Sequence, residues 1–138
     1  MTSPIVEAQL SLLRRLNTLT PSLPVSYEGI EFVPPQNQAY LRVQFIIQDP
    51  QDPVIGDMYY REQITMQVFV NDLLDTGTFS AIEKAESIRQ LFKKGTTLVE
   101  GTTEIHILST PKISGVIPTT ERLVVPIMID TLFEVYKE

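Results

Sequence analysis

The residues of this chain that could do chemistry are few, and a single histidine comes first among them. His106 lies between Ile105 and Ile107 in a segment that alternates like a strand, and it is the only histidine in the sequence. A general base needs an orienting carboxylate and a nucleophile, and Ser109 follows too closely along a strand to be a good partner. With no second imidazole and no cysteine, the usual zinc ligands are missing. We therefore expect His106 to have a structural role.

Carboxylates are the other candidates for catalysis or metal binding. Asp49, Asp52 and Asp57 fall in a connection rich in turn-forming residues, and Asp72 and Asp75 follow a strand-like segment. The first group lacks the ordered alternation and central glycine of a calcium-binding loop, and loop carboxylates are commonly solvated turn residues. The glycines are isolated, without a phosphate-cradling pattern. The sequence predicts no catalytic residue, no cofactor and no metal.

Composition bounds the class of protein. The 138 residues are 43% hydrophobic and 20% charged, which fits one globular domain over residues 1–138. Acidic side chains outnumber basic ones, 17 to 11, and the basic residues are scattered, which argues against tight nucleic-acid binding. The start of the chain lacks the pattern of a signal peptide, and no apolar run approaches the roughly 20 residues that span a bilayer. We expect a soluble, cytoplasmic product.

The first half of the chain predicts a helix and a long hairpin. Ser3 and Pro4 are suited to begin a helix over residues 4–16, with the serine oxygen as its cap. A short strand over residues 25–27 follows two helix-ending prolines. Residues 40–48 and 59–71 each alternate like half-buried strands, and the turn-rich segment between them indicates an antiparallel hairpin. On the second strand, Phe69 interrupts an otherwise polar face.

The second half predicts another helix and two strands. Ser80 and Glu83 have the spacing of a capping box, so a helix is expected from there to about Lys94. Its apolar stripe contains two alanines, which favours close packing on a sheet. Residues 104–108 and 123–136 read as strands joined by a linker. The last strand is nearly continuously apolar to Ile129, which predicts cover on both faces, and Pro126 prevents one of its edges from completing a ladder. The predicted fold class is α+β, an antiparallel or mixed sheet packed against both helices.

One apolar group could be a contact with another subunit. Ile55, Met58, Tyr59 and Tyr60 lie at the mouth of the hairpin loop. Apolar residues on a projecting element can be buried by a partner. The alternative is that the two tyrosines pack back onto their own sheet, and the sequence leaves both interpretations open.

Several segments, in their order along the chain, resemble the tail terminator family of long-tailed bacteriophages. The resemblance covers nearly the whole length. The family often has an aromatic-Pro-Asn group where this chain has Tyr27-Glu28-Gly29. The segments that carry the resemblance, after the N-terminal helix, are Phe32-Val33-Pro34-Pro35, Tyr40-Leu41-Arg42-Val43, Gly77-Thr78 leading to Ala81, Ala85, Ile88 and Phe92, and Val125-Pro126-Ile127.

The resemblance implies a virion structural protein. Such a protein assembles with itself into a ring, a hexamer, on the head-proximal end of the tail tube, stops tube polymerisation and presents a surface to the head connector. Its partners would be the tail tube protein and a head-connector or neck protein, with genome DNA passing through the lumen and no membrane involved. We expect it at the head–tail junction of the virion, after assembly in the host cytoplasm. The alternatives are a head-completion or neck adaptor protein and a small α+β binding protein or enzyme using His106.

Overall fold

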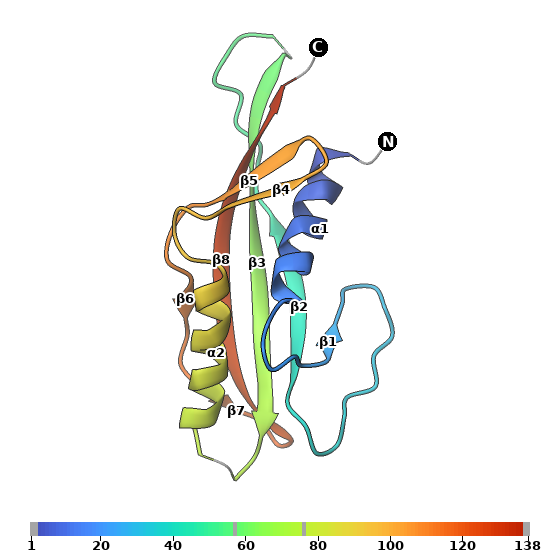
Figure 1. Cartoon of the computed structure of the whole chain (residues 1–138), viewed down its shortest axis with the longest axis vertical. Helices are drawn as coiled ribbons and strands as arrows, with labels where there is room; N and C mark the ends of the chain where they lie inside the picture. The colour runs from blue at the N-terminus through green and yellow to red at the C-terminus, as the bar shows by residue number, and fades with distance from the viewer. Residues whose placement is uncertain (1–2, 57, 76, 137–138) are drawn as a thin grey trace.

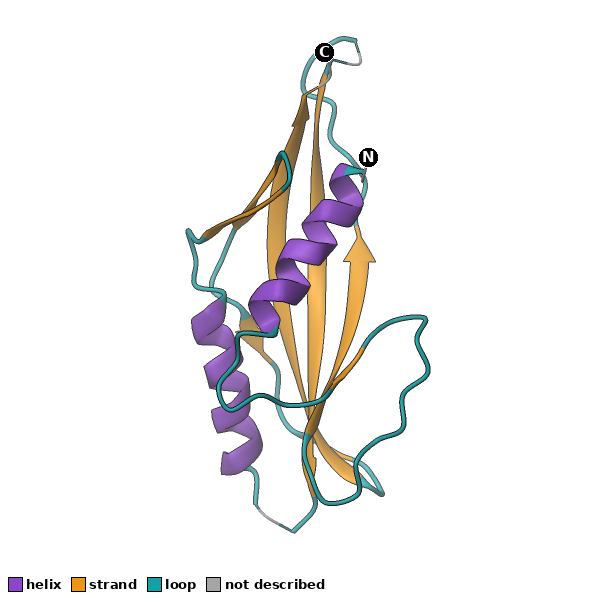
Figure 2. Cartoon of the chain, turned by 45° about the vertical axis from the view of Figure 1, so that its right-hand side comes forward, coloured by secondary structure: helices purple, strands orange, loops and turns teal. Residues whose placement is uncertain are grey.

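The computed structural model describes residues 3–56, 58–75 and 77–136. Within these residues, two helices lie on one face of an eight-stranded mixed sheet (Figures 1 and 2). The predicted α+β class is therefore confirmed. In chain order the elements are α1 (Pro4–Leu16), β1 (Val25–Ser26), β2 (Tyr40–Ile47), β3 (Tyr59–Leu73), α2 (Phe79–Leu91), β4 (Thr97–Glu100), β5 (Thr103–Ile107), β6 (Lys112–Ile113), β7 (Ile117–Pro118) and β8 (Arg122–Tyr136).

The sheet is built around two long strands that run beside each other. Its order is β1-β2-β3-β8-β5-β4, with β6 and β7 also pairing with β8. β3 and β8 are paired from Tyr59 opposite Tyr136 to Leu73 opposite Arg122. The predicted hairpin of β2 and β3 is present and antiparallel, whereas the short β1 pairs with β2 in parallel. β3 and β8 extend past the N-terminal end of α1 toward the loop that joins β2 to β3 (Figure 1).

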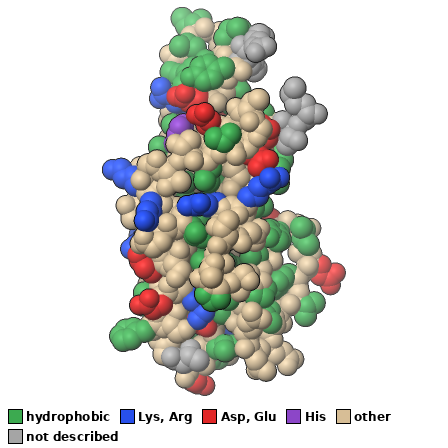
Figure 3. All heavy atoms as spheres, in the orientation of Figure 1, with side chains coloured by type: hydrophobic (Ala, Val, Ile, Leu, Met, Phe, Trp, Pro, Cys, Tyr) green, Lys and Arg blue, Asp and Glu red, His purple; other side chains and the backbone are tan. Residues whose placement is uncertain are grey.

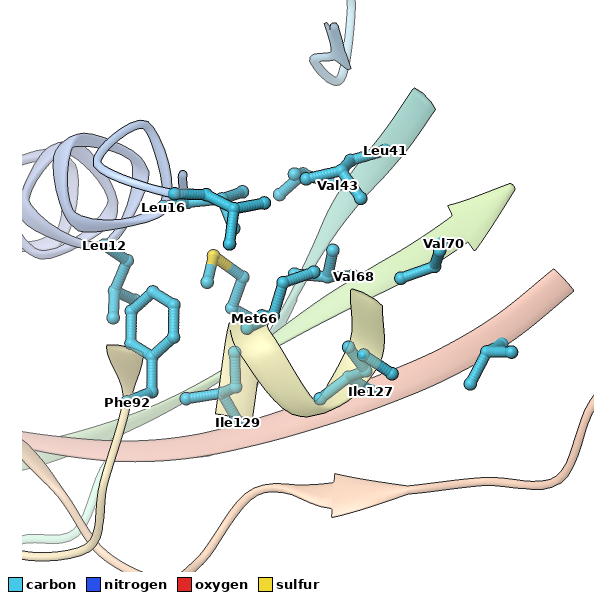
Figure 4. Close-up of a cluster of buried hydrophobic side chains, with 14 of the residues drawn as sticks. Leu12, Leu16, Leu41, Val43, Met66, Val68, Val70, Phe92, Ile127 and Ile129 are labelled. Atoms are coloured by element: carbon cyan, nitrogen blue, oxygen red, sulfur yellow. The ribbon is translucent and has the colours of Figure 1, made fainter. Parts of the chain in front are cut away.

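The core lies between the helices and one face of the sheet. Alternate residues of β3, among them Met66 and Val68, are fully buried, as the period-two pattern predicts. Leu12 and Leu16 of α1 meet Met66 from the other side, and Phe92 closes the cluster beside Ile129 (Figure 4). A second cluster contains Ala8, Ile64, Ile105, Phe133 and Val135.

Both helix caps differ from the prediction. The Ser3 side chain makes no capping hydrogen bond; the Glu7 amide donates to the Ser3 carbonyl instead, at 2.9 Å. In α2 the residue before the first turn is Thr78, and Ser80 lies inside the helix, where its hydroxyl accepts from Lys84 at 2.7 Å. The capping-box prediction is therefore wrong, because the helix begins at Phe79, one residue before Ser80.

The end of α2 also differs from the sequence expectation. The helix ends at Leu91, three residues before Lys94, and Phe92 turns out of helical geometry into the core. The guanidinium of Arg15 in α1 donates to the Leu91 carbonyl at 2.9 Å, so one helix satisfies an unpaired carbonyl at the C-terminus of the other. The two alanines of α2, Ala81 and Ala85, are fully buried against the sheet as expected.

β8 carries the proline that the sequence places in a long strand. The Pro126 carbonyl accepts from the Ser114 amide at 2.9 Å, so its missing N–H faces the gap between β6 and β7. A residue's N–H and carbonyl point to the same side of a strand, which explains why the proline is tolerated there. The expected interruption of the ladder is confirmed. The expectation of cover on both faces is wrong, because Val124 and Met128 on the helix-free face are only half-buried.

Three strands fall outside the prediction. β4 precedes β5 and forms a hairpin with it, from Thr97 opposite His106 to Glu100 opposite Thr103. β6 and β7 lie in the segment expected to be a linker, and each adds two residues to the edge of β8. Strands this short have too few residues to display a period of two.

The long loop between β1 and β2 is held by an arginine from β8. Arg122 donates to the carbonyls of Gln38, at 2.6 Å, and of Pro35. Its guanidinium lies 5.0 Å from the centre of the Tyr40 ring, which in turn packs against Phe32 at 5.2 Å. These contacts explain why an aromatic residue and two prolines precede the strand, because together they fix the path of an otherwise irregular segment.

Candidate subunit interface

The loop joining β2 to β3 forms one end of the molecule. Its base is closed by a pair of backbone hydrogen bonds between Gln51 and Arg61, at 2.8 and 2.9 Å. Ile55 is fully exposed and Met58 is 57% exposed. Figure 3 shows hydrophobic side chains gathered at this end of the molecule. The loop therefore presents apolar groups on a closed base.

Tyr59 and Tyr60 lie on opposite faces of β3, so the four predicted interface residues do not form one surface. Tyr60 packs against the second core cluster, on the same side as Ala8 and Phe133. Its burial raises the pKa of the Tyr60 hydroxyl, to which the charge of Glu62 adds. Tyr59 faces the helix-free side, where its ring lies 4.8 Å from that of Tyr136. Both tyrosines thus pack onto their own sheet, and Ile55 and Met58 remain as the exposed pair.

Four side chains join in a polar network around Tyr59. The Tyr59 hydroxyl donates to one oxygen of Glu134 at 2.8 Å and accepts from Arg61 at 2.9 Å. The Tyr136 hydroxyl donates to the other Glu134 oxygen at 2.9 Å. The hydrogen bonds from Tyr59 and then Tyr136 lower the pKa of the Glu134 carboxyl, so it is ionised at neutral pH. The network braces the ends of β3 and β8 beneath the exposed loop.

His106 lines a cleft beside this network. The cleft measures about 270 Å³ and includes Glu104 and Glu134. The ring nitrogen Nδ1 of His106 lies 3.1 Å from the Thr97 hydroxyl, directly across the β4–β5 hairpin. A hydrogen bond between register partners supports the hairpin. This contact gives His106 a place in holding the hairpin together.

The acidic residues singled out from the sequence differ in their surroundings. In the described part of the chain, no cluster of three or more His, Asp or Glu side chains has the arrangement to hold a metal ion. Asp49 and Asp52 are exposed, and Asp57 lies outside the described residues. Asp72 is buried and pairs with Lys84 of α2 at 3.1 Å, so it fastens the end of β3 to that helix. Neither described helix is long and apolar enough to cross a membrane.

Sequence reasoning missed one side chain at the edge of the sheet. Oε1 of Glu28 accepts a hydrogen bond from the Phe45 amide of β2 at 2.8 Å. The two residues are 17 positions apart, and their approach depends on the parallel pairing of β1 with β2. No local pattern signals such a contact, because it follows from the tertiary path of the loop.

The features described so far are surfaces, edges and bracing contacts, as expected of a structural protein. The family described as phage tail terminator protein matches residues 7–130. The chain belongs to this family, and it is a structural component of the phage virion tail. The resemblance inferred from the sequence is thereby confirmed.

The fold also recurs among solved structures. Ten chains match, and one of them has 23% sequence identity with this chain and a TM-score of 0.74. The match covers 98% of this chain and 96% of the other. At that identity the likeness shows the fold alone. No curated protein matches the chain.

Proposed function

We propose that this protein terminates the phage tail. It forms a ring, a hexamer, on the head-proximal end of the tail tube, where it stops further polymerisation and provides the surface that joins the head. Membership of the tail terminator family over residues 7–130 carries this proposal. The partners are further copies of the chain, the tail tube protein and the head-connector protein.

The exposed loop supports a role in contacts between proteins. Ile55 and Met58 are apolar, solvent-exposed and carried on a base closed by hydrogen bonds. A preorganised apolar group loses little conformational freedom when a partner covers it. Tyr59 and Tyr60 contribute by holding the loop's position, since both pack on the sheet.

The charge of the protein suits a passage for DNA. The net charge is −6, and part of the positive charge is neutralised locally. A ring of acidic subunits lets a polyanion slide through without forming tight phosphate contacts. Ion pairs among the described residues include Arg14 with Glu100, Arg61 with Glu134, Lys84 with Asp72 and Arg89 with Glu86.

The proposal is tested by removing the protein from the phage. A mutant phage with a stop codon early in this gene is grown, and tail lengths are measured by negative-stain microscopy. Tails longer than those of the parent, without heads, are expected if the protein terminates the tube. Tails of normal length beside filled heads would overturn the proposal in favour of a neck adaptor. Expression of the intact chain from a plasmid is the control and restores normal tails.

A further inference from the structure

The outer edge of β2 is only partly covered. β1 pairs with β2 at two positions, Val25 with Leu41 and Ser26 with Arg42. On this side the Leu41 amide donates to the Pro24 carbonyl, and the Phe45 amide donates to Glu28. Because backbone groups two residues apart point the same way, those of Val43 and Ile47 also face this edge. The parallel register of Ser26 with Arg42 places the Val43 amide on the Ser26 carbonyl, so β1 covers the edge as far as Val43. In the described chain, no strand pairs with the edge from Phe45 to Ile47.

Glu28 covers part of this edge with a side chain that can rotate away from it. Its carboxylate takes the place that a neighbouring strand's carbonyl would have at the Phe45 amide, 2.8 Å away. A cleft of about 400 Å³ opens beside it, lined by residues of β1 and β2 and of the turn that follows β1. A carboxylate on a rotatable side chain blocks an edge without closing it permanently. Natural edge strands commonly use charges to prevent unwanted pairing.

The part of β2 that extends beyond β1 and the terminal strand β4 expose branched apolar residues. Ile47, at the end of β2, is 53% exposed, and Ile46 beside it is 39% exposed on the opposite face. At the other end of the sheet, Val99 of β4 is 62% exposed. Edge strands that remain in water are usually polar or charged. Apolar residues at both ends of one sheet indicate that each end is covered in the assembled state.

We propose that β2 of one copy, from Phe45 to Ile47, pairs with β4 of a second copy, so that the sheet continues around the ring. This rests on the ring of the proposed function. A head-to-tail ring needs two different complementary surfaces on each copy, and the uncovered end of β2 and the outer edge of β4 are such surfaces. From β2 to β4 the sheet passes through four antiparallel pairings, so the two strands run the same way and pair in parallel between copies.

Cysteine cross-linking tests this arrangement, because the chain contains no cysteine. Ile46 and Val99 lie on the same, helix-free face. Four strand spacings of about 4.8 Å separate them within one copy, which is too far for a disulfide. Ile46→Cys combined with Val99→Cys, and Gln44→Cys combined with Val99→Cys for a register two residues away, are oxidised in purified phage tails. A covalent ladder beyond the dimer is expected from at least one of the two double variants.

The controls separate this contact from random collision and from the proposed function. Each single cysteine variant can give dimers at most, and Ile47→Cys with Val99→Cys places the thiols on opposite faces, so no ladder is expected. No ladder from either same-face pair, in tails of normal length, would overturn the edge pairing while leaving the terminator role intact. Failure of the terminator role itself is read separately, from tail length in the phage that lacks the protein.

A second pair of variants tests the backbone of the edge directly. Ile47→Pro removes the amide that faces the edge, and Ile47→Ala removes the same side chain but keeps that amide. Each variant is supplied to the phage lacking the protein, after thermal unfolding has shown that it folds. At least a tenfold lower yield of complete phage is expected for the proline variant than for the alanine variant. Equal yields would contradict pairing at this edge.

Discussion

The Tyr59 hydroxyl donates a 2.8 Å hydrogen bond to Glu134, a residue on the neighbouring strand β8. The bond commits the polar end of Tyr59 to the protein itself. We therefore propose that recognition at this end of the molecule depends on the exposed Ile55 and Met58. The tyrosines act as supports beneath them.

Replacing Ile55 and Met58 with serine should separate assembly from folding. Both side chains are exposed, so the free energy of unfolding should change by less than about 0.5 kcal/mol. Incorporation into tails should fall, because the apolar area available to a partner is lost. Urea denaturation measures the first effect, and the amount of protein in purified tails measures the second. Unchanged incorporation would remove this loop from the interface.

Tyr60→Ala is the matched contrast, since Tyr60 packs against the core cluster that contains Ile64 and Phe133. Loss of that packing should lower the free energy of unfolding by roughly 1–3 kcal/mol. A Tyr60→Ala variant as stable as the parent would contradict this packing.

Asp72 should make stability depend on acid pH. Burial raises the pKa of this carboxyl, but hydrogen bonds from the Leu73 amide, Lys84 and Ser80, together with the charge of Lys84, outweigh burial and lower it. A lowered native pKa means that the contribution is present above the unfolded value of about 3.9 and is lost as pH falls through the native value. Asp72→Asn should therefore destabilise the protein at pH 7 and have a much smaller effect at pH 2. Urea midpoints at the two pH values measure this, and equal losses at both would contradict it.

Glu62 should have the opposite effect. Burial raises the pKa of its carboxyl, so the folded protein binds this proton more tightly than the unfolded chain does. Its contribution to stability is full below the ordinary glutamate value of about 4.3 and falls as pH rises through the native value. Glu62→Gln should raise the melting temperature at pH 7 and leave it nearly unchanged at pH 3. A lower melting temperature at pH 7 would show that the carboxylate has a favourable partner.

Arg122 should control the loop between β1 and β2. Arg122→Lys keeps the charge but loses the planar fork that reaches the carbonyls of Pro35 and Gln38. We expect a loss of about 1–2 kcal/mol in unfolding free energy and faster cleavage of residues 27–39 in limited proteolysis. Cleavage at the rate of the parent protein would contradict this role. Arg42→Lys, at the exposed cation–π contact with Phe69, is the control for a general effect of arginine loss.

The sequence predicts best the elements whose signals are local. The period of two over β2 and β3 and the steps of four, three and four residues from Ala81 to Phe92 appear in the structure as expected, because burial on one face dictates them directly. β4 has four residues with alternating exposure, which is too short a pattern to distinguish from a loop. The predicted capping box fails because the helix begins at Phe79, so Ser80 lies within the first turn and not at the cap position.

In the candidate interface too, local features could be predicted from the sequence and tertiary contacts could not. Neighbouring residues of a strand point to opposite faces, so Tyr59 and Tyr60 could not both belong to one surface once β3 included them. The exposure of Ile55 follows from its place in a turn-rich loop and could be predicted. The cap of Glu28 on Phe45 could not be, since it depends on where the loop of residues 27–39 returns to the sheet.

Immunogold labelling of intact virions tests the central claim most directly. A phage carrying a short epitope tag on this protein is labelled and viewed by negative-stain microscopy, with an untagged phage as the control. The account predicts gold at the junction of head and tail, at the same end in every particle, and at the corresponding single end of tails purified without heads. Gold at the distal tip or spread along the tail would contradict it.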